Sequence, residues 1–269
     1  MALPRPCIEL PKQAARAVLG VLTDIDDTLT TGGAISPDAL DALARLRASG
    51  LPVVAITGRP RGWSERFAQE WPISAIVAEN GAVALFCEGG EVRTEYAQDQ
   101  ATRDRNAVRL RDVAARVLRE LPEARLATDS AGRVTDIAVD HGEHAHLGPE
   151  QIERVVAIMR ECGMNATVSS IHINGWFGDH DKLSGARWMV RRLFGRDLDA
   201  EHERWVYVGD STNDQTMFGH FRLSVGVANL LDFAEALTVW PAYLTQGARG
   251  AGFAEVANRL LRLIPTRQR

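Results

Sequence analysis

The sequence predicts an α/β fold: a Rossmann-like parallel sheet with helices on both faces, interrupted by an inserted α+β domain. Strand-like and helix-like segments alternate over residues 18–78 and again over 182–263. This alternation is typical of a parallel sheet with right-handed crossovers. Between the two blocks, residues 82–178 follow a β-β-α-β-β-α-β order, which is typical of an α+β unit. We therefore expect a core domain of residues 1–81 and 179–269 and an inserted domain of residues 82–178.

The first block contains residue types that commonly mark the ends of strands and helices. Short apolar runs bounded by polar residues are typical of buried strands. Ser36 and Pro37 open an amphipathic segment that ends at Gly50, and these residue types are preferred at a helix N-cap, first turn and C-terminal end. The expected elements are strands at 18–22, 51–56 and 75–78, a helix from 37 to about 49, and a helix that ends at about 71.

The other two blocks show the same kinds of signal. In the insertion we expect a hairpin around Gly89-Gly90, which joins strands at 82–86 and 91–94. Further elements of the insertion are an arginine-rich helix at 102–120, strands at 125–128 and 134–139, a helix at 149–162, and one or two strands within 166–173. After the insertion we expect helices at 182–194, near 216 and at 253–263, and strands at 205–208 and 223–227.

Composition excludes several classes of protein. The 269 residues include 31 basic and 35 acidic residues, a net charge of −4, which argues against a nucleic-acid-binding surface. The three cysteines lie far apart, and no apolar run approaches the length of a membrane span. The first 20 residues lack a signal-like apolar segment. We therefore expect a soluble cytoplasmic protein with no nucleic-acid or membrane partner, and the sequence does not indicate an oligomeric state.

Polar clusters follow three of the expected core strands. They are Asp24 to Asp27, Thr57 to Arg59 and Asp210 to Asp214. A single cluster of this kind often only caps a turn, but ligands of open parallel sheets bind where strands end, so three clusters at one edge favour a site. Carboxylates that lie so close repel one another unless a cation lies among them, and oxygen ligands without nearby His or Cys favour Mg²⁺. Such a site suits a phosphate group.

These clusters, together with one lysine, resemble the four ordered motifs of the haloacid-dehalogenase-like (HAD) phosphohydrolases. The motifs are Asp24-Ile25-Asp26-Asp27-Thr28, Thr57-Gly58-Arg59, Lys182 and Gly209-Asp210-Ser211-Thr212-Asn213-Asp214. The resemblance covers about residues 18–86 and 178–258. The insertion resembles the α/β cap of the class II branch, which includes sucrose-phosphate phosphatase, mannosyl-3-phosphoglycerate phosphatase, phosphomannomutase and the Cof-type sugar phosphatases.

The resemblance implies a role for each residue. Asp24 is the expected nucleophile, which forms an aspartyl-phosphate, and Asp26 is the expected general acid and base. The expected Mg²⁺ ligands are Asp24, Asp26 through its backbone carbonyl, Asp210 and Asp214, the last either as a ligand or as a support for one. The expected phosphate-binding residues are Thr57, Gly58, Lys182 and Asn213.

Two positions depart from the usual pattern of the family. Asp27 and Leu183 stand where Gly is frequent, and both departures leave the expected mechanism intact. Lys182 is one of only two lysines among the 31 basic residues. A planar guanidinium is a poor substitute for a compact ammonium beside Asp24 and a phosphoryl group.

The resemblance implies a Mg²⁺-dependent phosphatase that hydrolyses a small phosphate ester, and we expect a sugar phosphate. An acid at position 26 indicates phosphate-ester chemistry but does not separate a hydrolase from a phosphomutase of the phosphomannomutase type. An alternative of another class is a phosphoacceptor signalling or binding module, which also uses an acid cluster, a Thr and a Lys but is a shorter single domain. The absence of a GxxxxGK[ST] run excludes a P-loop NTPase.

Substrate choice in capped enzymes of this kind lies largely with the cap. Asn174 and Trp176 are the expected sugar contacts, because they lie near the return to the core and a Trp ring can stack on a sugar. His141, His144 and His146 could suggest a metal site, but we favour a solvated loop, since the segment has no other ligand signature. We interpret the arginines of the 102–120 helix as its solvent-facing surface.

Overall fold

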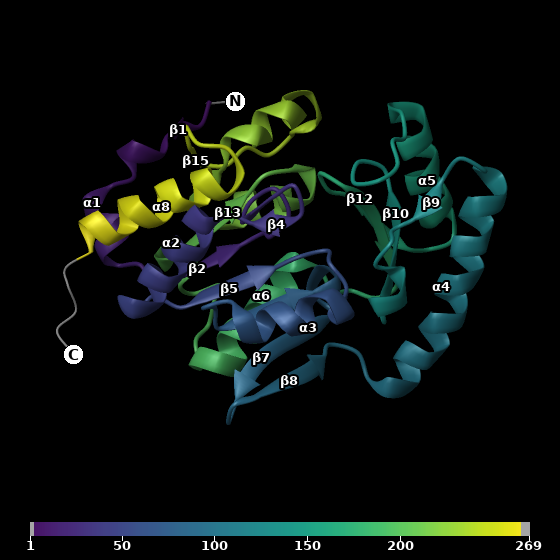
Figure 1. Cartoon of the computed structure of the whole chain (residues 1–269), viewed down its shortest axis with the longest axis horizontal. Helices are drawn as coiled ribbons and strands as arrows, with labels where there is room; N and C mark the ends of the chain where they lie inside the picture. The colour runs from purple at the N-terminus through teal and green to yellow at the C-terminus, as the bar shows by residue number, and fades with distance from the viewer. Residues whose placement is uncertain (1–2, 265–269) are drawn as a thin grey trace.

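A nine-stranded sheet is the centre of the larger domain in the computed structural model, which describes residues 3–264 (Figure 1). From β1 to β6 along the sheet, every pair of neighbours is parallel, whereas β7 and β8 are antiparallel. In sheet order the strands are β1 (Arg5–Pro6), β15 (Tyr243–Leu244), β14 (Leu223–Gly226), β13 (Trp205–Gly209), β2 (Gly20–Thr23), β5 (Val53–Ile56), β6 (Ala75–Ala78), β7 (Val83–Glu88) and β8 (Glu91–Tyr96).

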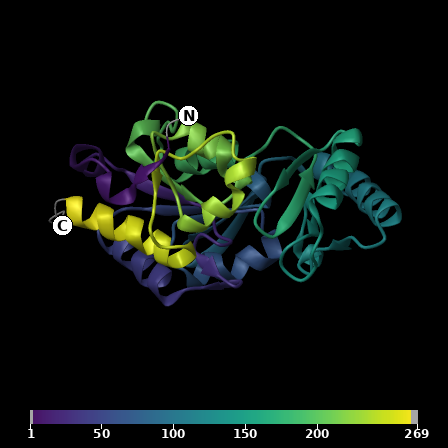
Figure 2. The ribbon, with the colours of Figure 1, turned by 90° about the horizontal axis from the view of Figure 1, so that it is seen from above.

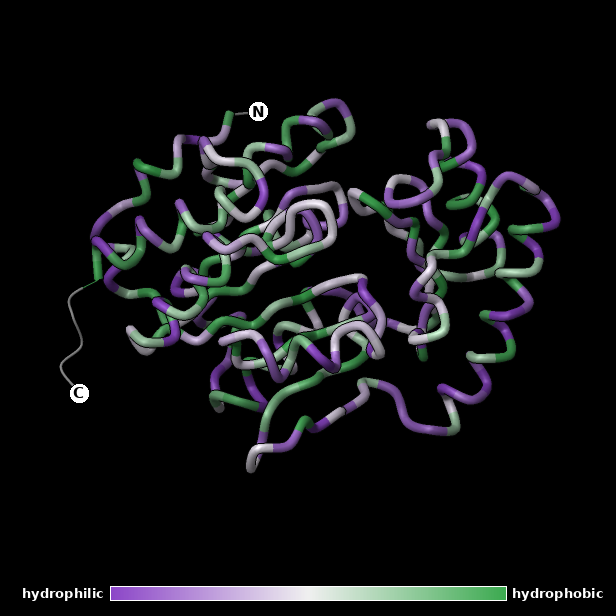
Figure 3. Tube along the Cα trace, in the orientation of Figure 1, coloured by the Kyte–Doolittle hydropathy of each residue, from purple (hydrophilic) through white to green (hydrophobic). Residues whose placement is uncertain are grey.

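Helices cover both faces of this sheet because its strands are apolar on both faces. Successive side chains of a strand point to opposite faces, so Val21 of β2 packs on one side and Leu22 on the other. In Figure 3 many green, hydrophobic residues lie along the trace at the centre of this domain. One face carries α1 (Lys12–Arg16), α2 (Pro37–Ala48), α3 (Arg61–Glu70) and α8 (Arg249–Leu263), and the other carries α6 (Lys182–Phe194) and α7 (Gln215–His220). The predicted α/β fold is thus confirmed.

The hairpin of β7 and β8 belongs to the main sheet. We expected it to begin the inserted domain, but β7 pairs with β6 along Ile76 to Ala78. The reason is packing: Val83 and Leu85 fill the same core as the parallel strands, and Ala84 and Phe86 fill the core on the opposite face. We propose that the inserted domain begins after β8 and comprises residues 97–178.

The smaller domain is a four-stranded antiparallel sheet with two helices on one face (Figure 2). Its sheet order is β11 (Asn165–Val168), β12 (His172–Trp176), β10 (Asp136–Asp140) and β9 (Arg125–Leu126), and its helices are α4 (Gln100–Glu120) and α5 (Pro149–Glu161). Val139 and Ile173 pack beneath the helices. The alternate residues, such as His172 and Asn174, therefore face the larger domain, which we call the core, and we call the smaller domain the cap.

Short segments complete the core and shape its edge. A small hairpin of β3 (Thr30–Thr31) and β4 (Ala34–Ile35) follows β2, and one-turn helices η2 (Glu79–Gly81) and η5 (Thr212–Asp214) follow β6 and β13. Ser36 caps α2 by accepting a hydrogen bond from the Ala39 amide at 3.2 Å. Within the described part of the chain, no helix combines the length and apolar character that a bilayer crossing requires.

Candidate active site

Three carboxylates meet where β2 and β13 end. These strands are neighbours in the sheet, so Asp24 and Asp210, which follow them, lie side by side. Asp214, in η5, completes the group, and one carboxylate oxygen of each residue lies within 4.8 Å of the others. All three residues are buried. The structure thus brings together the carboxylates that the sequence placed at one edge.

Lys182 joins this group from the other side. Its ammonium Nζ donates to Asp24 Oδ1 at 2.6 Å, to Asp214 Oδ1 at 2.7 Å and to Asn213 Oδ1 at 3.3 Å. Burial opposes the charge of this lysine, but Asp214 and Asp24 outweigh it and hold the Lys182 pKa above its ordinary value. The ammonium therefore stays protonated.

The N-terminal turn of α6 sets the position of Lys182. The carboxylate of Asp181, the N-cap, accepts a hydrogen bond from the Ser184 amide at 2.7 Å and fixes the start of the helix. One turn on, Gly185 packs directly on Gly81 of η2, where a Cβ at position 185 would lie 2.7 Å from the Gly81 Cα. This close approach lets α6 bring the lysine to the carboxylates.

The carboxylate group fits a hard cation. Burial and the neighbouring carboxylates raise the pKa of Asp210 well above its usual range, and burial raises the pKa of Asp24 although Lys182 opposes the shift. One ammonium thus faces three carboxylates, and the excess negative charge is buried. Ligands of this kind, all oxygen, are those that Mg²⁺ prefers.

Asp214 is the carboxylate with the fewest free lone pairs. Its Oδ1 accepts from Lys182 and from the Tyr207 hydroxyl, and its Oδ2 accepts from the Asp210 and Ser211 amides at 2.9 and 3.2 Å. A carboxylate offers about four lone-pair sites, so these four bonds occupy Asp214 fully. By contrast, Asp210 accepts one side-chain hydrogen bond, from Asn229 at 3.2 Å. Asp214 is therefore suited to hold the lysine and Asp210 to hold a metal ion.

The other expected catalytic residue, Asp26, lies beside the loop of residues 57–60 that follows β5, which we call the Thr57 loop. Its Oδ1 accepts from the Arg59 guanidinium at 2.8 Å, and the Thr57 hydroxyl lies 3.5 Å from its Oδ2. Burial raises the Asp26 pKa, and Arg59 only partly offsets this effect. A carboxyl group with a raised pKa is suited to donate a proton.

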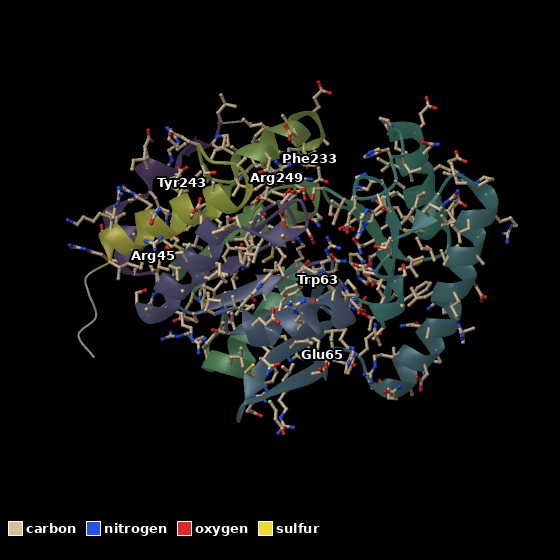
Figure 4. The ribbon with its side chains drawn as sticks, in the orientation of Figure 1. Arg45, Trp63, Glu65, Phe233, Tyr243 and Arg249 are labelled. Carbon is tan, nitrogen blue, oxygen red and sulfur yellow. The ribbon has the colours of Figure 1, made fainter. Side chains whose placement is uncertain are left out.

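Arg59 is the site residue to which the sequence gave no role. Its guanidinium is 5% exposed and also contacts Glu143 of the cap at 2.8 Å and Asp129 at 3.3 Å. It lies over the ring of Trp63, which Figure 4 labels on the side of α3 that faces the cap. The only sequence signal was its place after Thr57-Gly58, because Asp129 and Glu143 are distant in the chain.

Gly58 has two amide side chains against it. A Cβ at this position would lie 3.0 Å from Asn174 Oδ1 and 3.4 Å from Asn80 Nδ2, so a larger residue would displace them. Asn174 also donates to the Gly58 carbonyl at 3.3 Å and to Asp136 at 3.0 Å. Asn174, an expected sugar contact, is a residue of β12 in the cap. Its side chain packs against the Thr57 loop and so connects the cap to the core.

Asp27 adopts a backbone conformation that glycine favours. This conformation explains why Gly is frequent at the equivalent position of the family that the sequence resembles. Its φ is 54°, in the left-handed region that favours glycine and, next, Asp and Asn. Arg249, labelled at the start of α8 in Figure 4, donates to the Asp27 carboxylate at 2.8 Å. Asn229 donates to the Asp27 carbonyl at 3.1 Å as well as to Asp210. These bonds stabilise the turn that follows Asp26.

The cap loop after β10 exposes His144 and His146, as expected of a solvated loop, but its backbone is fixed by hydrogen bonds. Asp140 accepts hydrogen bonds from four successive amides, those of residues 142–145, at 2.9–3.1 Å. This arrangement directs Glu143 towards Arg59 and places its carboxylate 3.0 Å from His172 Nε2. His141 contacts the Ser169 carbonyl at 3.0 Å. The arginines of α4 lie on its solvent-facing side, as expected, and the exposed Arg109 also lies over the Phe177 ring.

Glu79 forms a further contact between the domains. This buried core residue accepts hydrogen bonds from the Val134 amide at 3.1 Å and the Thr135 amide at 2.6 Å, both in the cap. Burial and the nearby Asp136 raise the pKa of Glu79 to about 7. Together with the Arg59 contacts, these bonds hold the cap closed over the site.

Comparisons with known proteins agree with this fold. Residues 21–105 match the family model of haloacid dehalogenase-like hydrolases. A search of the curated proteins finds no match to the sequence. Solved structures do match, and each of the three described below covers at least 90% of this chain and 97% of its own.

Three of these structures illustrate the likeness. A protein from Thermoplasma acidophilum has a TM-score of 0.69 and 16% identity, and the match covers 92% of this chain and 99% of that one. The sucrose-phosphatase of Synechocystis, in complex with sucrose and phosphate, has a TM-score of 0.63 and 16% identity, and the match covers 90% of this chain and 97% of that one. The C-terminal domain of C. albicans trehalose-6-phosphate phosphatase has a TM-score of 0.66 and 14% identity, and the match covers 98% of this chain and 99% of that one. The resemblance to the haloacid-dehalogenase-like hydrolases is confirmed, by the sequence of residues 21–105 and by the fold of the core and its cap.

Proposed function

We propose that this protein is a Mg²⁺-dependent phosphatase that hydrolyses small sugar phosphates. The observation that carries the proposal is the buried group of Asp24, Asp210 and Asp214 around Lys182, at the carboxyl ends of parallel strands. The matching family model and the phosphatases among the structural neighbours support it. The Asp24 carboxylate, the Asp26 carbonyl and Asp210 would hold the ion, which would neutralise charge on the phosphoryl group when bound.

The first chemical step transfers the phosphoryl group to Asp24. A carboxylate oxygen of Asp24 attacks phosphorus, and the bond between phosphorus and the leaving oxygen breaks. Asp26 in its protonated form donates a proton to that oxygen, so the leaving group departs as an alcohol. Lys182, already bonded to Asp24 at 2.6 Å, directs one oxygen of this carboxylate and offsets the charge of the phosphoryl group.

The second step restores the enzyme. Asp26, now a carboxylate, takes a proton from water, the water oxygen attacks phosphorus, and the bond between phosphorus and Asp24 breaks to release inorganic phosphate. Thr57, Gly58 and Asn213 surround the position of the phosphate oxygens in this proposal. Asp214, whose lone pairs are all used, holds Lys182 in place.

Phosphate release from a panel of sugar phosphates, phosphoglycerate glycosides and nucleotides, with Mg²⁺ and with EDTA, tests the proposal. We expect turnover of sugar phosphates that EDTA abolishes, and no turnover by Asp24→Asn. Full phosphate release by Asp24→Asn would show that the nucleophile is wrong. Return of an isomeric sugar phosphate in place of free phosphate would indicate a phosphomutase.

A further inference from the structure

Tyr207 lies in the middle of β13, on the face of the sheet that α6 and α7 cover. Successive side chains of a strand point to opposite faces, so Tyr207 shares its face with position 209, whereas Val206 and Val208 pack on the other face. The residue at position 209 is Gly, which has no side chain. It leaves a space on this face between the Tyr207 ring and the end of the strand.

The carboxylate of Asp214 fills this space. A Cβ at position 209 would lie 2.6 Å from Asp214 Cγ, so a larger residue there would displace the carboxylate. The Tyr207 hydroxyl reaches along the same face and donates a hydrogen bond to Asp214 Oδ1. Tyr207 is fully buried, and its ring centroid lies 5.9 Å from that of Phe218 and 6.1 Å from that of Phe221. This packing holds the hydroxyl in one place.

The two oxygens of the Asp214 carboxylate are fixed by different groups. Oδ2 accepts from the backbone amides of Asp210 and Ser211 at 2.9 and 3.2 Å. A carboxylate held at one oxygen can still turn about that point, so these amides do not determine where Oδ1 lies. Oδ1 accepts from Tyr207, a packed residue of the sheet, and from Lys182, the end of a long side chain. The tyrosine therefore fixes the tilt of the carboxylate.

The position of Asp214 Oδ1 decides where the Lys182 ammonium lies. An ammonium has three N–H donors, and Nζ uses them on Asp24 Oδ1 at 2.6 Å, on Asp214 Oδ1 at 2.7 Å and on Asn213 Oδ1 at 3.3 Å. The two carboxylates thus compete for one cation at nearly equal distances. Asp214 Oδ1 also accepts from the Tyr207 hydroxyl, so it attracts the ammonium less than an oxygen without another donor would. The ammonium therefore stays close to Asp24.

We infer that Tyr207 is a positioning residue for the proposed phosphoryl transfer, because its hydroxyl fixes Asp214 Oδ1 and thereby keeps the Lys182 ammonium beside Asp24. This inference rests on the proposed function, in which the lysine directs Asp24 and offsets the charge of the phosphoryl group. Without the hydroxyl, Asp214 should draw the ammonium towards itself and away from the nucleophile.

The experiment compares Tyr207→Phe with the matched control Tyr243→Phe. Tyr243 is a second buried tyrosine of the same sheet, on β15, and its hydroxyl accepts a hydrogen bond from Arg5 at 2.6 Å. Both variants lose one oxygen atom and one hydrogen bond, but only the first loses them at the carboxylates. Urea unfolding shows that each variant is folded, and kcat is measured with the ester of the panel that the wild-type protein turns over fastest.

A second measurement reports the ammonium itself. The chain has two lysines, and Lys12 is exposed. Protein labelled with ¹³C,¹⁵N-lysine therefore gives two Nζ signals in an NMR spectrum that correlates Nζ with the Cε protons. Lys12→Arg identifies the remaining signal as that of Lys182. This signal depends on the surroundings of the ammonium and needs no activity.

We expect kcat to fall by roughly 10-fold in Tyr207→Phe, about the value of one hydrogen bond to a charged group, and the Lys182 signal to shift. In Tyr243→Phe both kcat and the signal should match those of the wild-type protein. A Lys182 signal that is unchanged in Tyr207→Phe, or that shifts as far in Tyr243→Phe, would overturn the inference, and so would an unchanged kcat in Tyr207→Phe. These results would leave the proposed phosphatase intact, whereas failure of the wild-type protein to hydrolyse any ester would overturn the proposed function.

Discussion

The acidic residues at the edge of the core differ from those at the contact with the cap. At the edge, the Lys182 ammonium pairs with Asp24 and Asp214, and Asp210 is a third carboxylate of the same buried group. At the contact, carboxylates are matched by nearby guanidinium groups or by backbone amides. Arg59 binds Asp26, Asp129 and Glu143, and Arg133 binds Asp129 and Asp136.

This difference separates a site that needs a ligand from an interface that does not. Uncompensated buried charge destabilises a protein, so we expect a cation to increase stability at the core edge. At the cap contact the guanidinium groups pair with the carboxylates of the protein itself, so these ion pairs stabilise the closed arrangement without a ligand, whereas burial disfavours the charge of Glu79. Substitutions in the two regions should therefore differ in how stability responds to Mg²⁺ and to pH.

Asp210→Asn tests the core edge and should have the largest effect. Because the Asp210 pKa is raised by burial, Asp24 and Asp214, removal of its charge should stabilise the protein without Mg²⁺ and raise Tm. Phosphate release should fall by about 1,000-fold, since a metal ligand is lost. Thermal unfolding with and without Mg²⁺ should show that the ion raises Tm in the wild-type protein and little in the variant.

Asp214→Asn is the matched control for this prediction. Its carboxylate accepts from two amides, an ammonium and a hydroxyl, so an amide there would place N–H groups against donors and lower Tm. Equal changes of Tm in the two variants would contradict the distinction between a metal ligand and a positioning residue.

The same contrast explains what could be predicted from the sequence. The carboxylates of the core edge follow the ends of strands, so their proximity can be predicted from the positions of the strands in the sequence. Helix Lys182–Phe194 and strand Ala75–Ala78 have the predicted bounds. The contacts of the cap depend on how a separate domain packs on the core. Arg59 and Glu143 are 84 positions apart, and no local pattern pairs them. Likewise, the pairing of β7 with β6 is a tertiary contact that the hairpin signal does not encode.

Glu79→Gln tests the cap contact through pH and should have the next largest effect. The Glu79 pKa is about 7 in the folded protein against an ordinary 4.5. The unfolded chain ionises near pH 4.5 while the folded protein keeps the proton, so this residue lowers stability as pH rises from 4.5 through 7. The wild-type protein should lose about 3 kcal/mol of unfolding free energy relative to Glu79→Gln over that range.

Urea unfolding of both proteins at pH 5, 6, 7 and 8 measures this difference. Buried acids that lie apart from Glu79, such as Asp210, contribute equally in both proteins and cancel in the comparison, whereas Asp136, which raises the Glu79 pKa, is part of the measured difference. Parallel pH profiles for the two proteins would show that Glu79 is ionised throughout, because the amides of Arg61, Val134 and Thr135 and the Thr135 hydroxyl, which all donate to it, outweigh its burial.

Glu143→Gln should have a smaller effect with the opposite dependence on pH. The hydrogen bond from His172, opposed by burial and assisted by Arg59, lowers the Glu143 pKa to about 2. Its carboxylate therefore contributes stability above the ordinary pKa of 4.5, and this contribution is lost as pH falls from 4.5 towards 2. Because the side chain is 19% exposed, we expect the variant to be less stable than the wild-type protein by only about 1–2 kcal/mol at pH 7. The difference should shrink in urea unfolding at pH 4 and pH 3.5.

Glu91→Gln, at an exposed position on the hairpin, is the control and should leave stability unchanged at each pH. A Glu143→Gln defect that stays constant with pH would mean that Glu143 acts through shape and not through its charge on Arg59.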